Sequence, residues 1–506
     1  FEAEPVAPGA APTTTSPTLV ARNPATGAEL GRVEPTTAAG VVEAVARARA
    51  AQSAWGALAW KDRRAILREF WAVLARGADD WAAQIRDEVG KPTTEAMVEV
   101  VAALDAVRWT VKNAGKVLAD RPLARGWQRA LLVPPGRLQW RPYGVVGMVA
   151  TWNYPLFLTA PPIAQALATG NAVVWKPSES AMMSALRLQA ALRAAGVPEG
   201  LVAAVFGGHE AGRSLIGSEI DLGMFTGGVD AGRSVLAELG RRGRPAIAEL
   251  SGFDAAVVLP DAPLRSTARA LAWGAFVNAG QTCVAVKRVY VVGDPAPMAE
   301  ALAESARALR VGDPATATVD MGPLISSAAR DRFDAAIRAT SAAGARVLAG
   351  GAPTAGPGWF YAPTVLLADG PGPEAALAGA FGPVALVRGV ADESAAIHAA
   401  NAGPFGLSAS VWGRDRRRAR ALAERLEAGM VAINDHVAPS IHAASPFGGV
   451  KASGFGRTKG ALGLLAFAQA RTLHDRPPGG LRPHLPPDDG SLSRLLALYR
   501  KVFHPR

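Results

Sequence analysis

The chain has 506 residues, 49% of them hydrophobic and 19% charged, which excludes a disordered protein and predicts two or three globular domains. No run of 18 apolar residues is unbroken, so the sequence predicts no transmembrane helix. The net charge of +11 comes from basic residues that are scattered along the chain, and the sequence contains no recognised nucleic-acid-binding module. We therefore expect the protein to attract anionic ligands but to have no nucleic-acid partner.

The chain up to residue 120 is predicted to be mainly helical. Residues 1–17 are rich in Pro, Ala and Thr and resemble a linker, not a signal peptide, and residues 18–36 predict short strands and turns. Alanine, leucine and arginine then recur at helical spacing. The expected helices are Ala38–Ser53, Trp60–Ala78, Asp79–Val89 and Thr93–Ala119.

From Pro142 onward, apolar strands alternate with helices. The expected strands are Val145–Thr151, Ala172–Lys176, Leu201–Phe206 and Leu222–Thr226, and the expected helices are Thr159–Thr169, Ala181–Ala195 and Glu210–Gly217. Apolar runs without polar interruptions indicate a parallel sheet covered on both faces.

The same alternation restarts after Gly252. It predicts strands Ala255–Leu259 and Arg288–Val292 and helices Leu264–Ala279, Pro297–Arg310, Ala328–Ala343 and Glu393–Ala400. The fold class is therefore α/β, with two open α/β halves.

Two segments stand apart from these halves. Residues 121–141 have strand and turn character, with a hairpin tip expected at Pro134-Pro135-Gly136. After a Pro/Gly-rich stretch, Ser491–Val502 predicts a short basic amphipathic helix. A surface or subunit-contact helix is favoured there over membrane docking.

The only cysteine, Cys283, follows Gly280-Gln281-Thr282 and precedes the strand that includes Arg288. A lone thiol excludes an internal disulfide and predicts a reducing compartment, which favours the cytoplasm. It is either a buried, inert side chain or a nucleophile. Its position where a loop meets a strand favours the nucleophile.

Four other segments carry weak local signals. The glycines of Gly227-Gly228 can bring backbone N–H groups to a pyrophosphate, or serve an ordinary turn. Lys176 and Glu179, just past a strand, can meet ribose hydroxyls or simply form a turn. The side-chain amide of Asn153 can donate a hydrogen bond to an oxyanion, or it can bond the backbone of its own loop.

The fourth segment is Glu249-Leu250-Ser251-Gly252, at the junction of the two halves. A carboxylate at a domain junction can be a general base, and an ordinary salt-bridged Glu is the alternative.

Taken in order, these segments strongly resemble the aldehyde dehydrogenase superfamily over roughly residues 18–475. The matching motifs are Pro142-Tyr143-Gly144-Val145-Val146-Gly147, Trp152-Asn153-Tyr154-Pro155, Lys176-Pro177-Ser178-Glu179, Phe225-Thr226-Gly227, Glu249-Leu250, Gly280-Gln281-Thr282-Cys283, Met321-Gly322-Pro323-Leu324, Phe381-Gly382-Pro383-Val384, Ile433-Asn434 and Pro446-Phe447-Gly448-Gly449-Val450-Lys451-Ala452-Ser453-Gly454. Each motif is weak alone, but the ordered set is specific.

The resemblance implies oxidation of an aldehyde to its carboxylic acid through a thiohemiacetal and a thioester on Cys283. Asn153 and the backbone N–H of Cys283 would stabilise the oxyanion, and Glu249 would activate the hydrolytic water. The cofactor would be NAD, with NADP possible, because Glu179 would repel a 2′-phosphate. The cofactor residues that it implies are Thr151, Trp152, Lys176, Ser178, Glu179, Phe225, Thr226, Gly227, Gly228, Gly232, Leu250 and Phe381.

The resemblance also implies an organisation. A Rossmann-like cofactor domain would comprise residues 18–120 and 142–251, and a catalytic domain residues 252–450. Residues 121–141 and 470–485, including a strand near Arg471–His474, would form a small β oligomerisation arm of a homodimer or homotetramer, followed by the tail 486–506. No metal is expected.

The expected substrate is an apolar aliphatic or aromatic aldehyde, because the residues expected to line its tunnel are mostly apolar: Tyr154, Phe157, Leu158, Trp109 and Ile441. The alternatives are a succinate-semialdehyde type, a version that passes the acyl group to coenzyme A, and a catalytically silent member. Retention of Glu249 favours hydrolysis over transfer to coenzyme A.

The sequence also departs from the family. Gly379 stands where a Glu usually holds the nicotinamide ribose, which predicts weaker nicotinamide binding. Gly228 replaces a frequent Ser, Thr458 a frequent Glu, and the run Ser251-Gly252-Phe253-Asp254-Ala255 the usual Gly-Gly-Lys-x-Pro.

Overall fold

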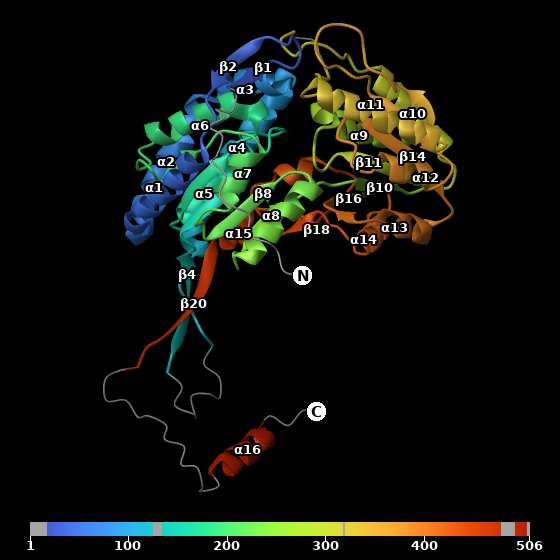
Figure 1. Ribbon diagram of the computed structural model, residues 1–506. Helices are drawn as coiled ribbons and strands as arrows, with labels where there is room; N and C mark the ends of the chain where they lie inside the picture. The colour runs from blue at the N-terminus through green and yellow to red at the C-terminus, as the bar shows by residue number, and fades with distance from the viewer. Residues whose placement is uncertain (1–17, 125–133, 317–318, 477–490, 503–506) are drawn as a thin grey trace, which may run out of the picture. The chain divides into compact units, whose positions relative to one another are not determined.

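The computed structural model describes residues 18–124, 134–316, 319–476 and 491–502 (Figure 1). The expected linker 1–17 and parts of the expected arm and tail lie outside these ranges. The chain divides into two compact units: Phe1–Val117 with Pro142–Ala468, and Leu118–Arg141 with Gln469–Arg506.

A six-stranded sheet lies in the first part of the larger unit. Its strand order is β19-β9-β8-β5-β6-β7, parallel except for the edge strand β19, which runs antiparallel to β9. The strands are β5 (Val145–Val149), β6 (Ala172–Lys176), β7 (Val202–Ala204), β8 (Leu222–Thr226), β9 (Ala246–Glu249) and β19 (Gly454–Phe455). The apolar runs of β5, β6 and β8 are buried almost throughout, as the sequence predicts for a covered parallel sheet.

Helices and a small hairpin accompany this sheet. They are β1 (Leu19–Arg22), β2 (Glu29–Val33), α1 (Ala38–Ala57), α2 (Trp60–Arg76), α3 (Ala78–Val89), α4 (Thr93–Val117), α5 (Ala160–Ala168), the 3₁₀ helix η2 (Glu179–Ala181), α6 (Met182–Ala194), α7 (His209–Ile216), α8 (Val229–Arg241) and α15 (Gly460–Ala466). The side chain of Thr37 accepts a hydrogen bond from the backbone N–H of Gly40 and starts α1. The late helix α15 packs on α4 and α5, so the chain returns to this half near its end.

A seven-stranded sheet forms the second half, in the order β12-β13-β14-β11-β10-β16-β17. Only the edge strand β12 is antiparallel to its neighbour. The strands are β10 (Asp254–Val258), β11 (Val286–Val292), β12 (Arg346–Ala349), β13 (Thr364–Ala368), β14 (Val384–Val390), β16 (Ser408–Trp412) and β17 (Met430–Ile433). The strands β15 (Phe405–Gly406) and β18 (Val450–Lys451) form a separate two-stranded antiparallel sheet.

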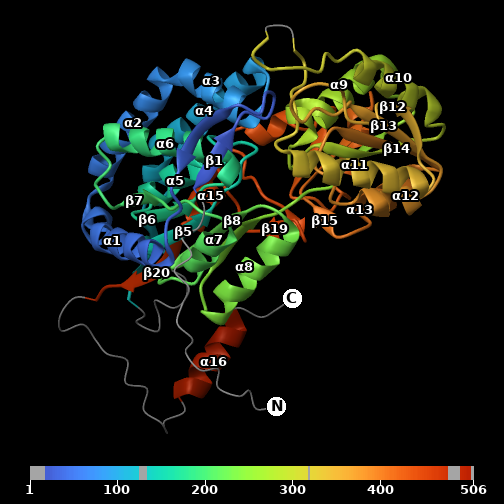
Figure 2. The same cartoon turned by 45° about the horizontal axis from the view of Figure 1, so that its top comes forward.

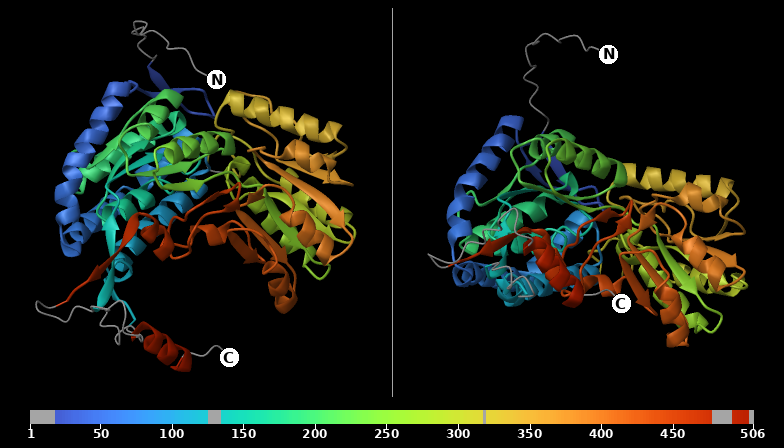
Figure 3. Two further views of the ribbon diagram at one scale, coloured as in Figure 1. Left: turned by 60° about the horizontal axis from the view of Figure 1, so that its bottom comes forward. Right: turned by 90° about the horizontal axis from the view of Figure 1, so that it is seen from below.

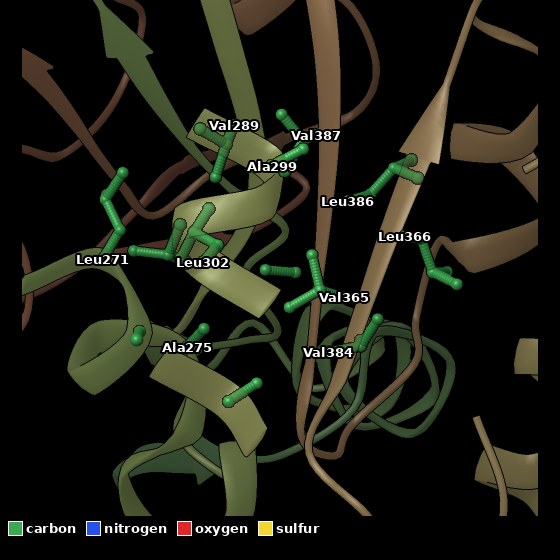
Figure 4. Close-up of a cluster of buried hydrophobic side chains, with 14 of the residues drawn as sticks. Leu271, Ala275, Val289, Ala299, Leu302, Val365, Leu366, Val384, Leu386 and Val387 are labelled. Carbon is green, nitrogen blue, oxygen red and sulfur yellow. The ribbon is translucent and has the colours of Figure 1, made fainter. Parts of the chain in front are cut away.

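Helices cover both faces of this sheet, α9, α10 and α11 on one and α13 and α14 on the other (Figures 1 and 2). They are α9 (Leu264–Phe276), η3 (Val277–Gly280), α10 (Ala296–Arg307), α11 (Ser327–Ala342), α12 (Gly372–Leu377), α13 (Glu393–Asn401), α14 (Arg416–Ala423) and η4 (Ala438–Ile441). Side chains of α9 and α10 meet those of β11, β13 and β14 in the main buried cluster (Figure 4).

Several predicted boundaries in this half differ from the structure; the helix expected at Pro297–Arg310, for example, is Ala296–Arg307, and two other differences lie next to the thiol. The helix expected at Leu264–Ala279 ends at Phe276, because Asn278 and Ala279 take left-handed backbone angles with φ of 55° and 51°. The strand expected from Arg288 begins at Val286, although Lys287 is charged.

The smaller unit contains a three-stranded sheet of order β20-β4-β3. Its elements are β3 (Arg121–Pro122), β4 (Gly136–Pro142), β20 (Ala468–His474) and the helix α16 (Ser491–Val502), which is the red helix next to the C-terminus in Figure 3. Arg471 of β20 donates a hydrogen bond to Gln139 of β4 over 2.6 Å. Leu496, Leu498 and Val502 of α16 are exposed.

Across the described ranges, no helix combines the length and apolar composition that crossing a membrane requires.

Candidate active site

The carboxyl ends of four parallel strands bring the predicted residues to one edge of the six-stranded sheet. Val149 of β5 pairs with Lys176 on one side and Phe225 on the other, and Thr226 pairs with Glu249. Trp152 and Asn153 lie in the loop that follows β5. In a parallel sheet this edge is where ligands bind.

Cys283 approaches from the amino end of β11 in the other sheet. The preceding turn bends sharply at Gly280, whose φ is 66° and where any Cβ would collide with the carbonyl oxygen of Gly382. The buried ammonium of Lys287 donates to the carbonyls of both Gly280 and Gly382. Glycine at 280 is therefore required both by conformation and by space.

Gln281 anchors this turn to the Met321–Leu324 motif. Its side-chain nitrogen donates to the carbonyl of Pro323 over 3.3 Å, and its side-chain oxygen accepts from the N–H of Ile325 over 2.9 Å. Two motifs far apart in the sequence thus hold one loop.

Asn153 links the two sheets. Its side-chain nitrogen donates to the carbonyl of Gln281 over 3.0 Å, and its own carbonyl accepts from Asn278 over 3.1 Å. An amide carries two N–H groups, so one remains for an oxyanion beside Cys283. The neighbouring Tyr154 hydroxyl bonds Thr282 over 2.7 Å.

The Cys283 sulfur lies among apolar side chains, although the residue keeps some exposed surface. Burial raises the pKa of its thiol to about 12, and the carboxylates of Asp254 and Glu249 act in the same direction. The backbone N–H groups of Val284 and Cys283 act against them. The thiol is therefore protonated at neutral pH in the isolated protein.

Glu249 is buried at the end of β9, and burial raises its pKa to about 7. The hydroxyl of Thr458 donates to its Oε1, and the charges of Lys459 and Arg457 act against the rise. The Thr that replaces a frequent Glu thus binds the expected base directly. A carboxylate with a pKa near 7 is suited to exchange protons at neutral pH.

Lys459 is a buried cation that the sequence analysis missed. Its φ is 58°, and its ammonium donates to the carbonyl of Ser440 and lies over the rings of Phe157 and Phe447, at 4.9 and 5.0 Å. Charge interactions couple it to Glu249 and Cys283. No local pattern marks it, because its neighbours come from distant segments.

Three further residues with ionisable side chains were missed as site residues: Asp254, Lys287 and His436. Asp254 opens an otherwise apolar, fully buried strand, and Lys287 is buried in β11 beside Arg288. Charged residues within such apolar runs are a signal that the sequence already contains.

The expected ribose contacts form a local ion pair. The ammonium of Lys176 is 3.4 Å from the Glu179 carboxylate and donates to the carbonyl of Pro177 over 2.9 Å. Ser178 caps η2 through the N–H of Ser180.

The glycines at the start of α8 have different roles. At Gly228, the N-cap of α8, a Cβ would meet nothing within 4 Å, which leaves open space at the helix N-terminus. Gly227 lies against the ring of Phe225, and Gly232 lies against Leu250. Gly232 therefore allows α8 to pack closely, and of the three glycines only Gly228 has open space where a Cβ would stand.

Trp152 and Phe381, expected near the pyrophosphate and near the nicotinamide end of the cofactor respectively, meet edge to face with ring centroids 5.9 Å apart. Gly379 has a φ of 86° and open space where a Cβ would stand. A Glu at this position would adopt a strained backbone.

The expected substrate residues are only partly brought together. The Tyr154 hydroxyl forms a hydrogen bond with Thr282, the neighbour of Cys283. The ring of Phe157 lies against the ammonium of Lys459. Leu158 and Trp109 are half-buried, and Ile441 is exposed at the end of η4, without a contact that joins them to Cys283 among the described residues. Instead, Val277, Val437 and Phe447 pack around the thiol.

The chain matches the model of the aldehyde dehydrogenase family over residues 12–473. It is 36% identical to the 4,4'-diapolycopene aldehyde oxidase of a Methylomonas species, covering 89% of this chain and 84% of that one. It is 34% identical to the NADP⁺ succinate-semialdehyde dehydrogenase of Mycobacterium avium, covering 89% and 95%. A Mycobacterium tuberculosis aldehyde dehydrogenase complexed with NAD⁺ superposes with a TM-score of 0.87 at 31% identity, covering 93% and 97%.

Proposed function

The chain belongs to the aldehyde dehydrogenase family, and from that premise we propose that it oxidises an apolar aldehyde to the carboxylic acid by covalent capture on Cys283. NAD⁺ is the preferred hydride acceptor and NADP⁺ the alternative. The observation that carries the proposal is the convergence of Cys283, Glu249 and Asn153 from two different sheets.

The residues around the thiol support the capture step. The sulfur attacks the carbonyl carbon, and the displaced electron pair becomes an oxyanion. The free N–H of Asn153 and the backbone N–H of Cys283 are suited to stabilise it. Glu249, with a pKa of about 7, takes the thiol proton and loses the charge that opposes the thiolate.

The residues at the sheet edge fit a dinucleotide. Lys176 and Glu179 would meet the adenosine ribose, and the open N-terminus of α8 at Gly228 would receive the pyrophosphate. A bound NAD(P)⁺ supplies the hydride acceptor. Glu179 disfavours a 2′-phosphate, while its ion pair with Lys176 offsets part of its charge, so both cofactors are expected to work, NAD⁺ better.

The carboxylate of Glu249 is also the general base for hydrolysis of the Cys283 thioester. Glu249, once deprotonated, removes a proton from water as the water oxygen bonds to the acyl carbon and the carbon–sulfur bond breaks. The acid leaves, and the departing sulfur takes the proton from Glu249, so that Cys283 recovers its thiol and Glu249 its charge.

We further infer that residues 18–120 and 142–251 form the cofactor domain and 252–450 the catalytic domain. A homodimer or homotetramer in the cytoplasm would use the arm of residues 121–141 and 470–485. The three-stranded sheet of the smaller unit, with edge strands β20 and β3, supports a role in strand pairing between subunits. Light scattering with and without residues 470–506 tests this; a monomeric full-length chain would refute it.

The test of the main proposal is a panel of linear, branched and aromatic aldehydes, assayed with NAD⁺ and NADP⁺ by reduced-cofactor absorbance. Apolar aldehydes with NAD⁺ should give the highest kcat/KM.

Cys283→Ala should abolish turnover while retaining the wild-type Tm, and Glu69→Gln, on the surface, is the matched control. Turnover by Cys283→Ala would refute covalent capture. An inactive wild type with NAD⁺ bound would indicate a silent member.

A second candidate substrate is succinate semialdehyde. The buried Lys459 cation beside Phe157 favours it, since it is a possible partner for a carboxylate, and relatives carry that name. Preference for succinate semialdehyde, lost in Lys459→Met, would support this candidate. A requirement for coenzyme A would instead indicate acyl transfer, which the retained base Glu249 disfavours.

A further inference from the structure

The turn that precedes Gln281 contains three consecutive residues with left-handed backbone angles. Their φ angles are 55° at Asn278, 51° at Ala279 and 66° at Gly280. Glycine takes this conformation freely and asparagine tolerates it, but at Ala279 the Cβ crowds the following carbonyl oxygen. Such a strained run persists only where contacts from the surrounding structure hold it in place.

Asn278 is the residue of this turn that joins the two parts of the site. Its side-chain nitrogen donates to the carbonyls of Asn153 and Gln281, over 3.1 Å in each case. The side chain of Asn153 donates to the same carbonyl of Gln281 over 3.0 Å. Because these hydrogen bonds share their partners, a change in the backbone at Asn278 would move the oxyanion donor Asn153 relative to Cys283.

A carboxylate that the steps above do not use holds the backbone of Asn278. Glu95 is half-buried in the first turn of α4, and its Oε2 accepts the backbone N–H of Asn278 over 2.8 Å, across 183 positions of sequence. Glu95 and Val277 also line a cavity of about 460 Å³ together with side chains of α9 and α10. Since the space beside Val277 is open, packing alone does not fix the turn on that side, and the hydrogen bond to Glu95 does.

The same face of α4 also holds the loop that carries Asn153. Glu99 follows Glu95 by four residues, so the two side chains lie one helical turn apart on one face. The Oε1 of Glu99 accepts the backbone N–H groups of Leu156 and Phe157, over 3.0 and 3.2 Å. One helix therefore holds the loop after β5 through Glu99 and the turn before the cysteine through Glu95.

We propose that Glu95 is a positioning residue, which holds residues 278–280 in their left-handed form and thereby keeps the amide of Asn153 in place relative to Cys283. It acts through the N–H of Asn278 and not on the aldehyde. The role requires an acceptor oxygen and does not require a negative charge. The inference rests on the proposed function, because it names a further positioning residue for that reaction.

The test compares Glu95→Gln with Glu95→Leu in the full-length protein. Glutamine keeps an acceptor oxygen for Asn278, whereas leucine has similar bulk and no acceptor. Glu95→Leu should lower kcat about tenfold or more, because misplacing a reacting group by about 1 Å costs up to about 10²-fold. The KM for NAD⁺ should stay near its wild-type value, since the turn is remote from Lys176 and α8 in the fold. Glu95→Gln should keep kcat within about threefold of wild type.

Two controls separate this role from a general effect on the fold. Glu304→Leu is the matched control, because Glu304 is exposed and lines the same cavity from α10, and its kcat should equal that of wild type. Adding Ala279→Gly to Glu95→Leu should recover most of the lost kcat, because glycine takes the left-handed angles without support. If Glu95 served only as an acidic residue at the start of α4, glutamine would be as damaging as leucine, and Ala279→Gly would recover nothing.

Hydrogen exchange followed by mass spectrometry reads the same contact without an aldehyde. The backbone amides of a peptide covering residues 277–283 should exchange faster in Glu95→Leu than in wild type or Glu95→Gln. Unchanged exchange in Glu95→Leu, an unchanged kcat in an active enzyme, or equal losses in both variants would overturn the proposal. A wild type that is silent toward every aldehyde, with the expected change in exchange, would refute the proposed function and support the hold of Glu95 on the turn.

Discussion

Replacing Glu249 with Gln should stabilise the protein, and increasingly so as pH rises. The folded chain holds this carboxylate at a pKa of about 7 because burial disfavours its charge, against an ordinary value of 4.5. At about 1.36 kcal/mol per pKa unit, ionising Glu249 in the folded protein costs about 3 kcal/mol more than in the unfolded chain.

The sign follows from the raised pKa. The wild type has its full contribution below about pH 4.5 and loses it as pH rises through 7, where the folded protein must carry a buried charge. Glutamine is uncharged throughout and can still accept from Thr458. The advantage of Glu249→Gln should therefore be small near pH 4.5, grow to about 3 kcal/mol near pH 7 and remain level above it.

Urea denaturation of both proteins between pH 5 and 8.5, followed by near-ultraviolet circular dichroism, measures this difference. Glu69→Gln is the matched control, because its side chain is 49% exposed and forms a surface ion pair with Arg76. It should show no comparable trend. A difference for Glu249→Gln that stays constant across this range, or falls with pH, would refute the buried, raised-pKa carboxylate.

Three further results are expected. Asn153→Ala should lower kcat by about 10²–10³-fold, because one oxyanion donor is lost; a kcat within threefold of wild type would contradict that role. Lys459→Met should move the lower limb of the kcat profile to higher pH, because Lys459 lowers the pKa of Glu249, and an unmoved limb would exclude that coupling. Gly280→Ala should destabilise the fold by about 3 kcal/mol or more through its positive φ and the clash with Gly382, measured by urea denaturation against Gly240→Ala, where a Cβ has open space.

The sequence predicts the parallel sheets wherever long apolar runs alternate with helices. Val145–Val149 and Ala172–Lys176 are examples, because burial on both faces requires unbroken apolar residues. Strands β12, β13, β14, β16 and β17 were not predicted. Strands such as β14 are as long as the predicted β5, but periodicity alone cannot distinguish such apolar runs from buried helix.

The ordered motifs predict Cys283, Glu249 and Asn153 as one site. They cannot predict what surrounds these side chains, since the partners are remote in the sequence. Thr458 binds Glu249 across 209 positions, and the Nε2 of His436 lies 3.8 Å from the Oδ2 of Asp254, which is likewise remote in the sequence. Charges in apolar strands indicate that a partner exists, but only the fold shows which one.

The return of the chain to the six-stranded sheet affects the order of events during synthesis. β19 closes the edge of β9 and Thr458 reaches Glu249, yet both come from residues after 453. A growing chain that already contains Cys283 and the whole seven-stranded sheet therefore still has an open edge at β9 and a buried carboxylate lacking its hydroxyl donor. Ribosome-bound intermediates are expected to depend on chaperones at that edge, and competence for catalysis should arise only after Thr458 has been translated.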